Sequence, residues 1–136
     1  MVDVKFNFEE SASEIFGTVW RQVAKVGFWS RKIRGWVDVI MIIDTGADYT
    51  ILPRFYAADL GVNLHKECVS YRTFGIGGSE KVYLLKNAKV KLGKWERFIP
   101  VGFINRENVP PLLGRQEFLE TFKITLMNHA TSFSLA

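Results

Sequence analysis

The residue best suited to catalysis is Asp44, which directly follows a run of apolar and β-branched residues. An acidic residue at the end of a buried strand is held on a rigid element while its carboxylate faces a cavity. Gly46 lets the backbone turn tightly just after it, and the hydroxyl of Thr45 can brace that turn with a local hydrogen bond. Taken alone, however, Asp-Thr-Gly favours a plain turn, because Asp and Gly are common in turns.

No other side chains form a competing catalytic centre. His65 and His129 are too few, and too far in sequence from a Cys or Asp pair, for a metal site or a triad. We interpret each as a surface or partly buried histidine. Cys68 is the only cysteine, which excludes an intrachain disulfide and suits a small buried side chain. The Gly-rich run 75–78 lacks the helix and Lys of a phosphate site. We therefore expect no metal and no cofactor.

The elements that position Asp44 are mostly strands. Alternation of apolar and polar residues predicts a half-buried strand at 2–8 and a bent strand at 15–28. A turn is expected at 27–34, followed at 36–43 by a strand buried on both faces. Further strands are predicted at 69–74, 80–92, 95–103, 123–128 and 131–135.

Helical patterns are scarce. Pro53 is expected to open a short helix that runs through Leu60 and stops at Gly61, and residues 114–122 are expected to form another. Neither linkers nor repeats divide the chain. The pattern predicts one mainly β, barrel-like domain over residues 1–136, with one or two short helices.

Composition narrows the class of protein. Hydrophobic residues make up 48% and charged residues 24% of 136 residues, as in an ordinary globular domain. The net charge of +4 comes from scattered Lys and Arg, so we expect no nucleic-acid partner. The first ten residues lack the features of a signal peptide, and the apolar run 39–43 is too short to cross a bilayer. These features predict a cytoplasmic, intracellular protein without membrane contact.

Three segments resemble the retropepsin-like aspartic proteases, the single-domain family of retroviruses and their cellular relatives. Residues 42–53 (IIDTGADYTILP) resemble the catalytic segment of this family. Residues 74–78 (FGIGG) resemble the tip of the flap that closes over substrate, and 111–115 (PLLGR) resemble a signature that packs beneath the catalytic loop. The three occur in the family's order, and the resemblance covers 36–126. It implies a closed β-barrel-like retropepsin (acid protease) fold.

The resemblance also implies a mechanism. Aspartic proteases need two adjacent carboxylates that share a proton, and this chain has one Asp-Thr-Gly. The expected enzyme is therefore an endopeptidase that acts as a homodimer on peptide or protein substrates, with one Asp44 from each subunit. The alternative is a catalytically silent peptide-binding or dimerisation module on the same fold.

The resemblance assigns roles around Asp44. Thr45 would bond across the dimer axis, and Gly46 and Asp48 would contact the substrate backbone. Arg115 would pair with Asp48, next to Gly114 in the structural signature. The plainer alternative for Asp48 and Arg115 is a pair of unrelated surface charges.

The same family pattern assigns Ile76, Gly77 and Gly78 to the flap, where Ile76 would contact substrate; a plain hairpin turn is the alternative. Residues 109–111 would line the substrate cleft. Tyr49 stands where many viral members have an acid, and the segment 1–30 is longer than in the viral enzymes. The residue at Tyr49 implies a different substrate preference, and the longer N-terminal segment implies a different dimer interface.

Overall fold

The computed structural model describes residues 3–75, 78–106 and 108–135. Its elements, in chain order, are β1 Asp3–Asn7, β2 Glu9–Ser13, β3 Gly17–Arg21, β4 Val23–Ser30, β5 Gly35–Ile43, β6 Thr50–Pro53, α1 Tyr56–Leu60, α2 Leu64–Glu67, β7 Val69–Gly75, β8 Gly78–Leu92, β9 Trp95–Ile104, β10 Leu112–Leu113, the 3₁₀ helix η1 Leu119–Thr121, β11 Lys123–Met127 and β12 Ala130–Ser134. The expected mainly β fold is confirmed, and the strands predicted around β1, β7, β8, β9, β11 and β12 are present. Within the described residues, no helix is long and apolar enough to span a bilayer.

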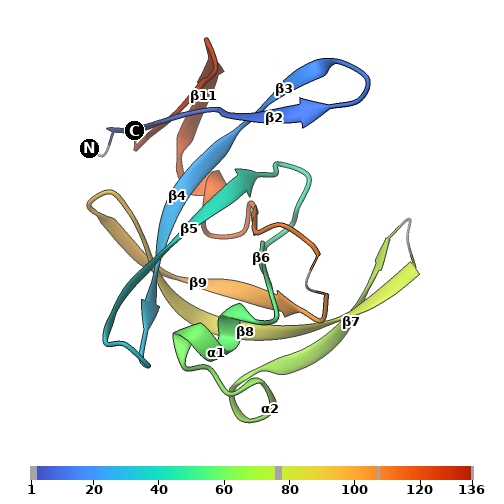
Figure 1. The fold of residues 1–136 in the computed structure, drawn as a ribbon. Coiled ribbons are helices and arrows are strands. Elements are labelled where there is room, and N and C mark those ends of the chain that lie inside the picture. Colours follow the sequence, from blue (N-terminus) through green and yellow to red (C-terminus); the bar gives the residue numbers. More distant parts are fainter. Residues whose placement is uncertain (1–2, 76–77, 107, 136) are drawn as a thin grey trace.

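Seven strands form the main sheet, in the order β4-β5-β10-β6-β9-β8-β7. β4 also pairs with β8, so the sheet curves back on itself and encloses the core (Figure 1). β5 and β10 run parallel, as do β6 and β9, while the other neighbours are antiparallel. This topology brings β10 between β5 and β6, which are the strands on either side of the Asp44 loop.

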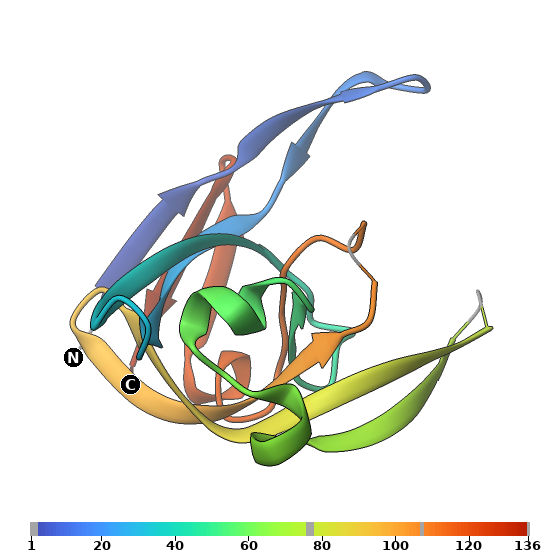
Figure 2. The same ribbon diagram turned by 60° about the horizontal axis from the view of Figure 1, so that its bottom comes forward.

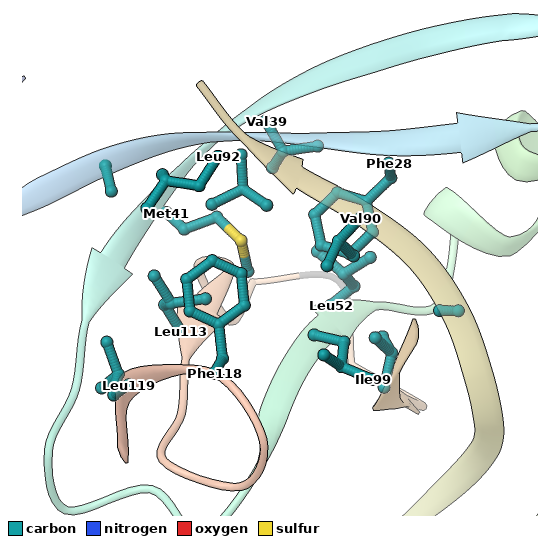
Figure 3. Close-up of a cluster of buried hydrophobic side chains, with 14 of the residues drawn as sticks. Phe28, Val39, Met41, Leu52, Val90, Leu92, Ile99, Leu113, Phe118 and Leu119 are labelled. Carbon is teal, nitrogen blue, oxygen red and sulfur yellow. The ribbon is translucent and has the colours of Figure 1, made fainter. Parts of the chain in front are cut away.

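The core lies inside the curved sheet and is almost entirely aliphatic and aromatic. Figure 3 shows side chains from β4, β5, β6, β8, β9 and β10 converging with that of Phe118, including those of Phe28, Met41, Leu52 and Val90. All five of these side chains are 1% exposed or less. Because full burial of one such side chain stabilises a fold by about 1.5–3 kcal/mol, this cluster holds the strands in register.

The two ends of the chain lie together outside the main sheet. β1, β12 and β11 form a three-stranded sheet in that order. It packs on the core through Phe133, whose ring meets Phe6 at 6.0 Å and Phe122 at 5.5 Å, both nearly edge-on. β2 and β3 form a separate two-stranded hairpin.

Several strand expectations were wrong in detail. β5 is not buried on both faces, since Asp38 is exposed and Ile40 is 47% exposed. The turn begins at Arg31 and not at Gly27, because β4 continues to Ser30. Gly27 lies in β4 opposite Lys91 of β8, and a Cβ on Gly27 would lie 2.9 Å from Cγ of Lys91.

The helix expectations were right about location and wrong about extent. Pro53 ends β6 and does not open a helix, while α1 stops as predicted at Gly61, whose φ of +72° is left-handed. Residues 114–122 form turns and only the short η1. The helix α2 was not predicted, although Asn63 caps it by accepting from two backbone N–H groups.

Candidate active site

Asp44 sits directly beyond the end of β5, as its place in the sequence indicated. Its backbone N–H donates to the carbonyl oxygen of Leu113 at 3.0 Å, and the preceding Ile42 N–H donates to that of Pro111 at 2.9 Å. Leu113 is fully buried and pairs with Ile43 in parallel. The start of the loop is thus fixed to β10 beneath it, while Asp44 itself is half-buried.

The loop turns around the carboxylate of Asp44. The N–H of Gly46 donates to Oδ1 of Asp44 at 3.0 Å, and the N–H of Ala47 donates to its carbonyl oxygen at 3.1 Å. A Cβ on Gly46 would lie 3.3 Å from that same Oδ1, so a side chain there would crowd the carboxylate. Thr45 is exposed, and among the described residues its hydroxyl makes no hydrogen bond, so it does not brace the turn within one chain.

Arg115 and Asp48 meet at the far end of the loop. An Nη of Arg115 donates to Oδ1 of Asp48, and the Nε donates to the carbonyl oxygen of Ala47 at 3.4 Å. Two backbone N–H groups, from Arg115 and Gln116, donate to the carbonyl oxygens of Ala47 and Asp48 at 3.0 and 2.8 Å. The ion pair expected from the sequence therefore forms, and backbone bonds hold the two segments together beside it.

Gly114 makes the closest backbone approach in the site. A Cβ at this position would lie 2.3 Å from the carbonyl carbon and oxygen of Tyr49, so only glycine fits. The N–H of Gly114 donates to Oγ1 of Thr50 at 3.2 Å, and Thr50 is fully buried. Sequence reasoning missed Thr50. The available signal was a polar residue at the start of an otherwise apolar strand.

Tyr49, which replaces an acidic residue of many viral members, packs inward from the loop. Its ring lies over Gly102, where a Cβ would be 2.7 Å from Cε2 of Tyr49 and 2.8 Å from Cγ1 of Val82. Burial, and secondarily the negative charge of Asp48, raises the pKa of the Tyr49 hydroxyl above its usual value. The Tyr49 hydroxyl is therefore uncharged at physiological pH.

The expected flap is a hairpin made by β7 and β8. The pairing runs to Gly75 opposite Gly78, and Gly78 has a left-handed φ of +108°. Phe74 is 81% exposed at this end of the hairpin. Ile76 and Gly77, which the sequence assigned to the flap tip, lie outside the described residues. Figure 2 shows the hairpin projecting from the body on the side of the Asp44 loop.

The residues expected to line the cleft lie between β9 and β10. Val109 and Pro111 are half-buried, and Pro110 is exposed. Two cavities in the described part of the chain lie elsewhere. One, of about 560 Å³, is lined mainly by α1, α2 and residues 105–106, and the other, of about 340 Å³, by β4, β8 and their neighbours. Asp44 lines neither of these cavities and is half-buried.

Nothing in the described part of the chain suggests a metal site. No group of three or more His, Cys, Asp or Glu side chains gathers there. Cys68 is half-buried, and burial raises the pKa of its thiol, which keeps it in the weakly reactive neutral form. His129 stacks on Trp20 with ring centroids 4.7 Å apart, so this histidine serves packing.

Comparison with known proteins agrees with this geometry. The family model described as aspartyl protease matches residues 30–116, and the chain belongs to that family. A crystal structure of a retropepsin-like aspartic protease from Rickettsia conorii is similar in fold, with a TM-score of 0.67 and 19% sequence identity. That match covers 97% of this chain and 98% of the other. No curated protein sequence matches the chain. The fold is therefore retropepsin-like.

Proposed function

We propose that two copies of this chain form an aspartic endopeptidase, with one Asp44 from each copy. The observation that carries the proposal is the anchoring of Asp44: β10 holds its backbone N–H at 3.0 Å, and the residue is only half-buried. The chain has a single Asp-Thr-Gly. Because this chemistry needs two carboxylates, a second copy must supply the other.

The two Asp44 carboxylates would share one proton, since two negative charges so close together cannot both form cheaply. The ionised carboxylate acts as general base on a water between them, and the protonated one donates to the oxygen of the scissile carbonyl. The N–H of Gly46 donates to Oδ1 of Asp44 and so orients the carboxylate. The two apparent pKa values belong to the pair.

The surrounding residues take supporting roles in this proposal. Thr45, exposed and without a partner among the described residues of its own chain, bonds across the dimer axis. Gly46 and Asp48 contact the substrate backbone, and Arg115 holds Asp48 in place. Gly114 permits the tight packing beneath the loop.

The β7–β8 hairpin closes over the bound peptide in this proposal. Ile76 contacts the substrate from the flap tip, while Gly77 and Gly78 give the tip the backbone freedom that closure needs.

The first test is cleavage of a diverse peptide mixture, followed by mass spectrometry from about pH 3 to pH 7, where a coupled carboxylate pair titrates. Wild type should cut, and Asp44→Asn should not. Asp38→Asn is the matched control, because it makes the same chemical change at an exposed position of β5, the strand that precedes Asp44. Peptide binding without cleavage, unchanged in Asp44→Asn, would instead favour a silent binding module.

Mixing wild type with Asp44→Asn tests the shared site directly. If each active site needs both carboxylates and subunits exchange freely, activity at constant total protein should fall as the square of the wild-type fraction. A linear fall would show that one Asp44 suffices, and the proposed mechanism would then be wrong.

A further inference from the structure

The hairpin of β2 and β3, residues 9–21, is here called the N-terminal arm. Within the described part of the chain its strands pair only with each other, and it projects from the body (Figure 2). A two-stranded hairpin is at best marginally stable alone in water. The aromatic contact with the body is near the root, where Trp20 stacks on His129 of the β11–β12 turn. Among the described residues, the outer part of the arm therefore has no strand partner outside the arm.

The tip of the arm displays two large apolar side chains. Ile15 is 82% exposed and Phe16 is 75% exposed. The tip is nevertheless a defined turn, since Oγ of Ser13 accepts from the N–H groups of both residues at 3.3 and 3.2 Å. Gly17 follows with a left-handed φ of +73°. An ordered turn that presents apolar residues to water is typical of a contact with another protein.

The root of the arm is tied to the proposed active site. Gln22 follows the arm directly, and its carbonyl oxygen accepts from the N–H of Ile43 at 3.0 Å. The Nε2 of Gln22 donates to the carbonyl oxygen of Ile43 at 3.1 Å. Ile43 immediately precedes Asp44, so the arm leaves the body next to the catalytic loop. In Figures 1 and 2 the arm and the β7–β8 hairpin both project toward the same side.

We infer that the N-terminal arm clasps a second copy of the chain beside the active site, with Ile15 and Phe16 as its anchors. The second copy is the one that the proposed function requires, so this inference rests on that function. Two-fold symmetry gives two such contacts per dimer.

Charge agrees with this choice of partner. The arm carries three glutamates, Glu9, Glu10 and Glu14, and one arginine, whereas the whole chain has a net charge of +4. An acidic arm is therefore attracted to the basic remainder of another copy. The arm thereby links dimer affinity to the assembly of the two Asp44 carboxylates.

The test is the dimer dissociation constant, measured by sedimentation over a range of protein concentrations. The double variant Ile15→Ser/Phe16→Ser should raise it at least about tenfold, as loss of interface anchors does. The matched control is Ile33→Ser/Phe98→Ser, which removes one Ile and one Phe of 60% and 58% exposure elsewhere on the surface. The control should leave the constant unchanged, and an unchanged constant in the arm variant would overturn the inference.

Peptide cleavage separates this inference from the proposed function. The arm variant should recover wild-type turnover per dimer once its concentration exceeds its raised dissociation constant. A wild type that dimerises and cleaves, with an arm variant of unchanged affinity, would leave the function standing and remove the clasp. A wild type that stays monomeric and inactive at every concentration would remove both.

Hydrogen exchange on the wild type gives a readout that needs no variant. Amides of the arm tip, including those of Ile15 and Phe16, should exchange more slowly as the concentration rises through the dissociation constant. Equal exchange in monomer and dimer would overturn the clasp.

Discussion

The N–H of Asp44 donates to the carbonyl oxygen of Leu113 across 3.0 Å, joining the proposed catalytic residue to a strand far along the chain. That strand, β10, also pairs with β6 on the other side of the loop. β10 therefore pairs with the strands at both ends of the Asp44 loop, and we call this arrangement the clamp. Changes to the residues that make this clamp should affect stability and activity together.

Gly114→Ala should destabilise the fold and abolish cleavage. The added Cβ would lie 2.3 Å from backbone atoms of Tyr49, which cannot move without breaking the clamp. We expect a loss of about 3 kcal/mol or more in the free energy of unfolding, measured by chemical denaturation. Gly35→Ala is the control, because its Cβ would meet nothing nearer than 3.8 Å. Equal stability in the two variants would contradict the packing described at Gly114.

Thr50→Val should destabilise the protein by about 1–3 kcal/mol, although valine has nearly the same shape. The change removes the oxygen that accepts from the N–H of Gly114 and leaves a buried donor without a partner. Thr50→Ser keeps that oxygen and should be the milder substitution in thermal or chemical unfolding. If serine proves worse than valine, packing of the methyl group matters more than the hydrogen bond.

The pair Arg115–Asp48 should contribute more to activity than to stability. Its side chains are 49% and 82% exposed, and exposed ion pairs contribute at most about 1 kcal/mol. A double-mutant cycle with Arg115→Ala and Asp48→Ala should give a coupling energy in that range, smaller at high salt. The same variants should lower kcat/KM for a cleaved peptide, because Asp48 is a proposed substrate contact. Unchanged cleavage would remove the functional role from this pair.

Glu67 should make stability depend on pH in the acid range. The hydrogen bond from Arg31, and then that from the N–H of Asn63, lowers the pKa of Glu67 below its usual value. The stabilisation is therefore present above the unfolded-state pKa, about 4.3, and lost as the pH falls through the lower folded-state pKa. Its size should stay below about 1 kcal/mol, since Arg31 is 54% and Glu67 29% exposed.

Glu67→Gln should thus be less stable than wild type at pH 6, with the difference shrinking below about pH 4. Glu96→Gln, at another exposed position, serves as control. The measurement is the unfolding midpoint of wild type and both variants between about pH 6 and below about pH 4. A difference that grows on acidification would contradict the sign derived from Glu67.

Much of the site could be read from local sequence. Apolar alternation located most strands, and the continuous run before Asp44 placed that residue at a strand end. The pairing of Arg115 with Asp48 was expected only from the resemblance to the retropepsin-like family, and the structure contains it. The error at β5 arose because an apolar residue can face solvent, as Ile40 does, and composition alone does not reveal which face is covered.

The strand β2, which completes the arm, and the two-residue strand β10 were not foreseen. Residues 9–13 (EESAS) carry no apolar alternation, so nothing local marks them as a strand that pairs with 17–21. Two residues are likewise too few to show any period, and β10 exists only because β5 and β6 lie on either side of it.

The sequence by itself determined that the chain is rich in strands and that it carries one Asp-Thr-Gly, on which the proposed two-chain dyad rests. Only the tertiary structure decided what supports that aspartate: β10 beneath the loop, Thr50 under Gly114, and the root of the arm beside Ile43. The physical reason is that these contacts join residues far apart in the chain. They form through shared burial and hydrogen bonding, which no local pattern encodes.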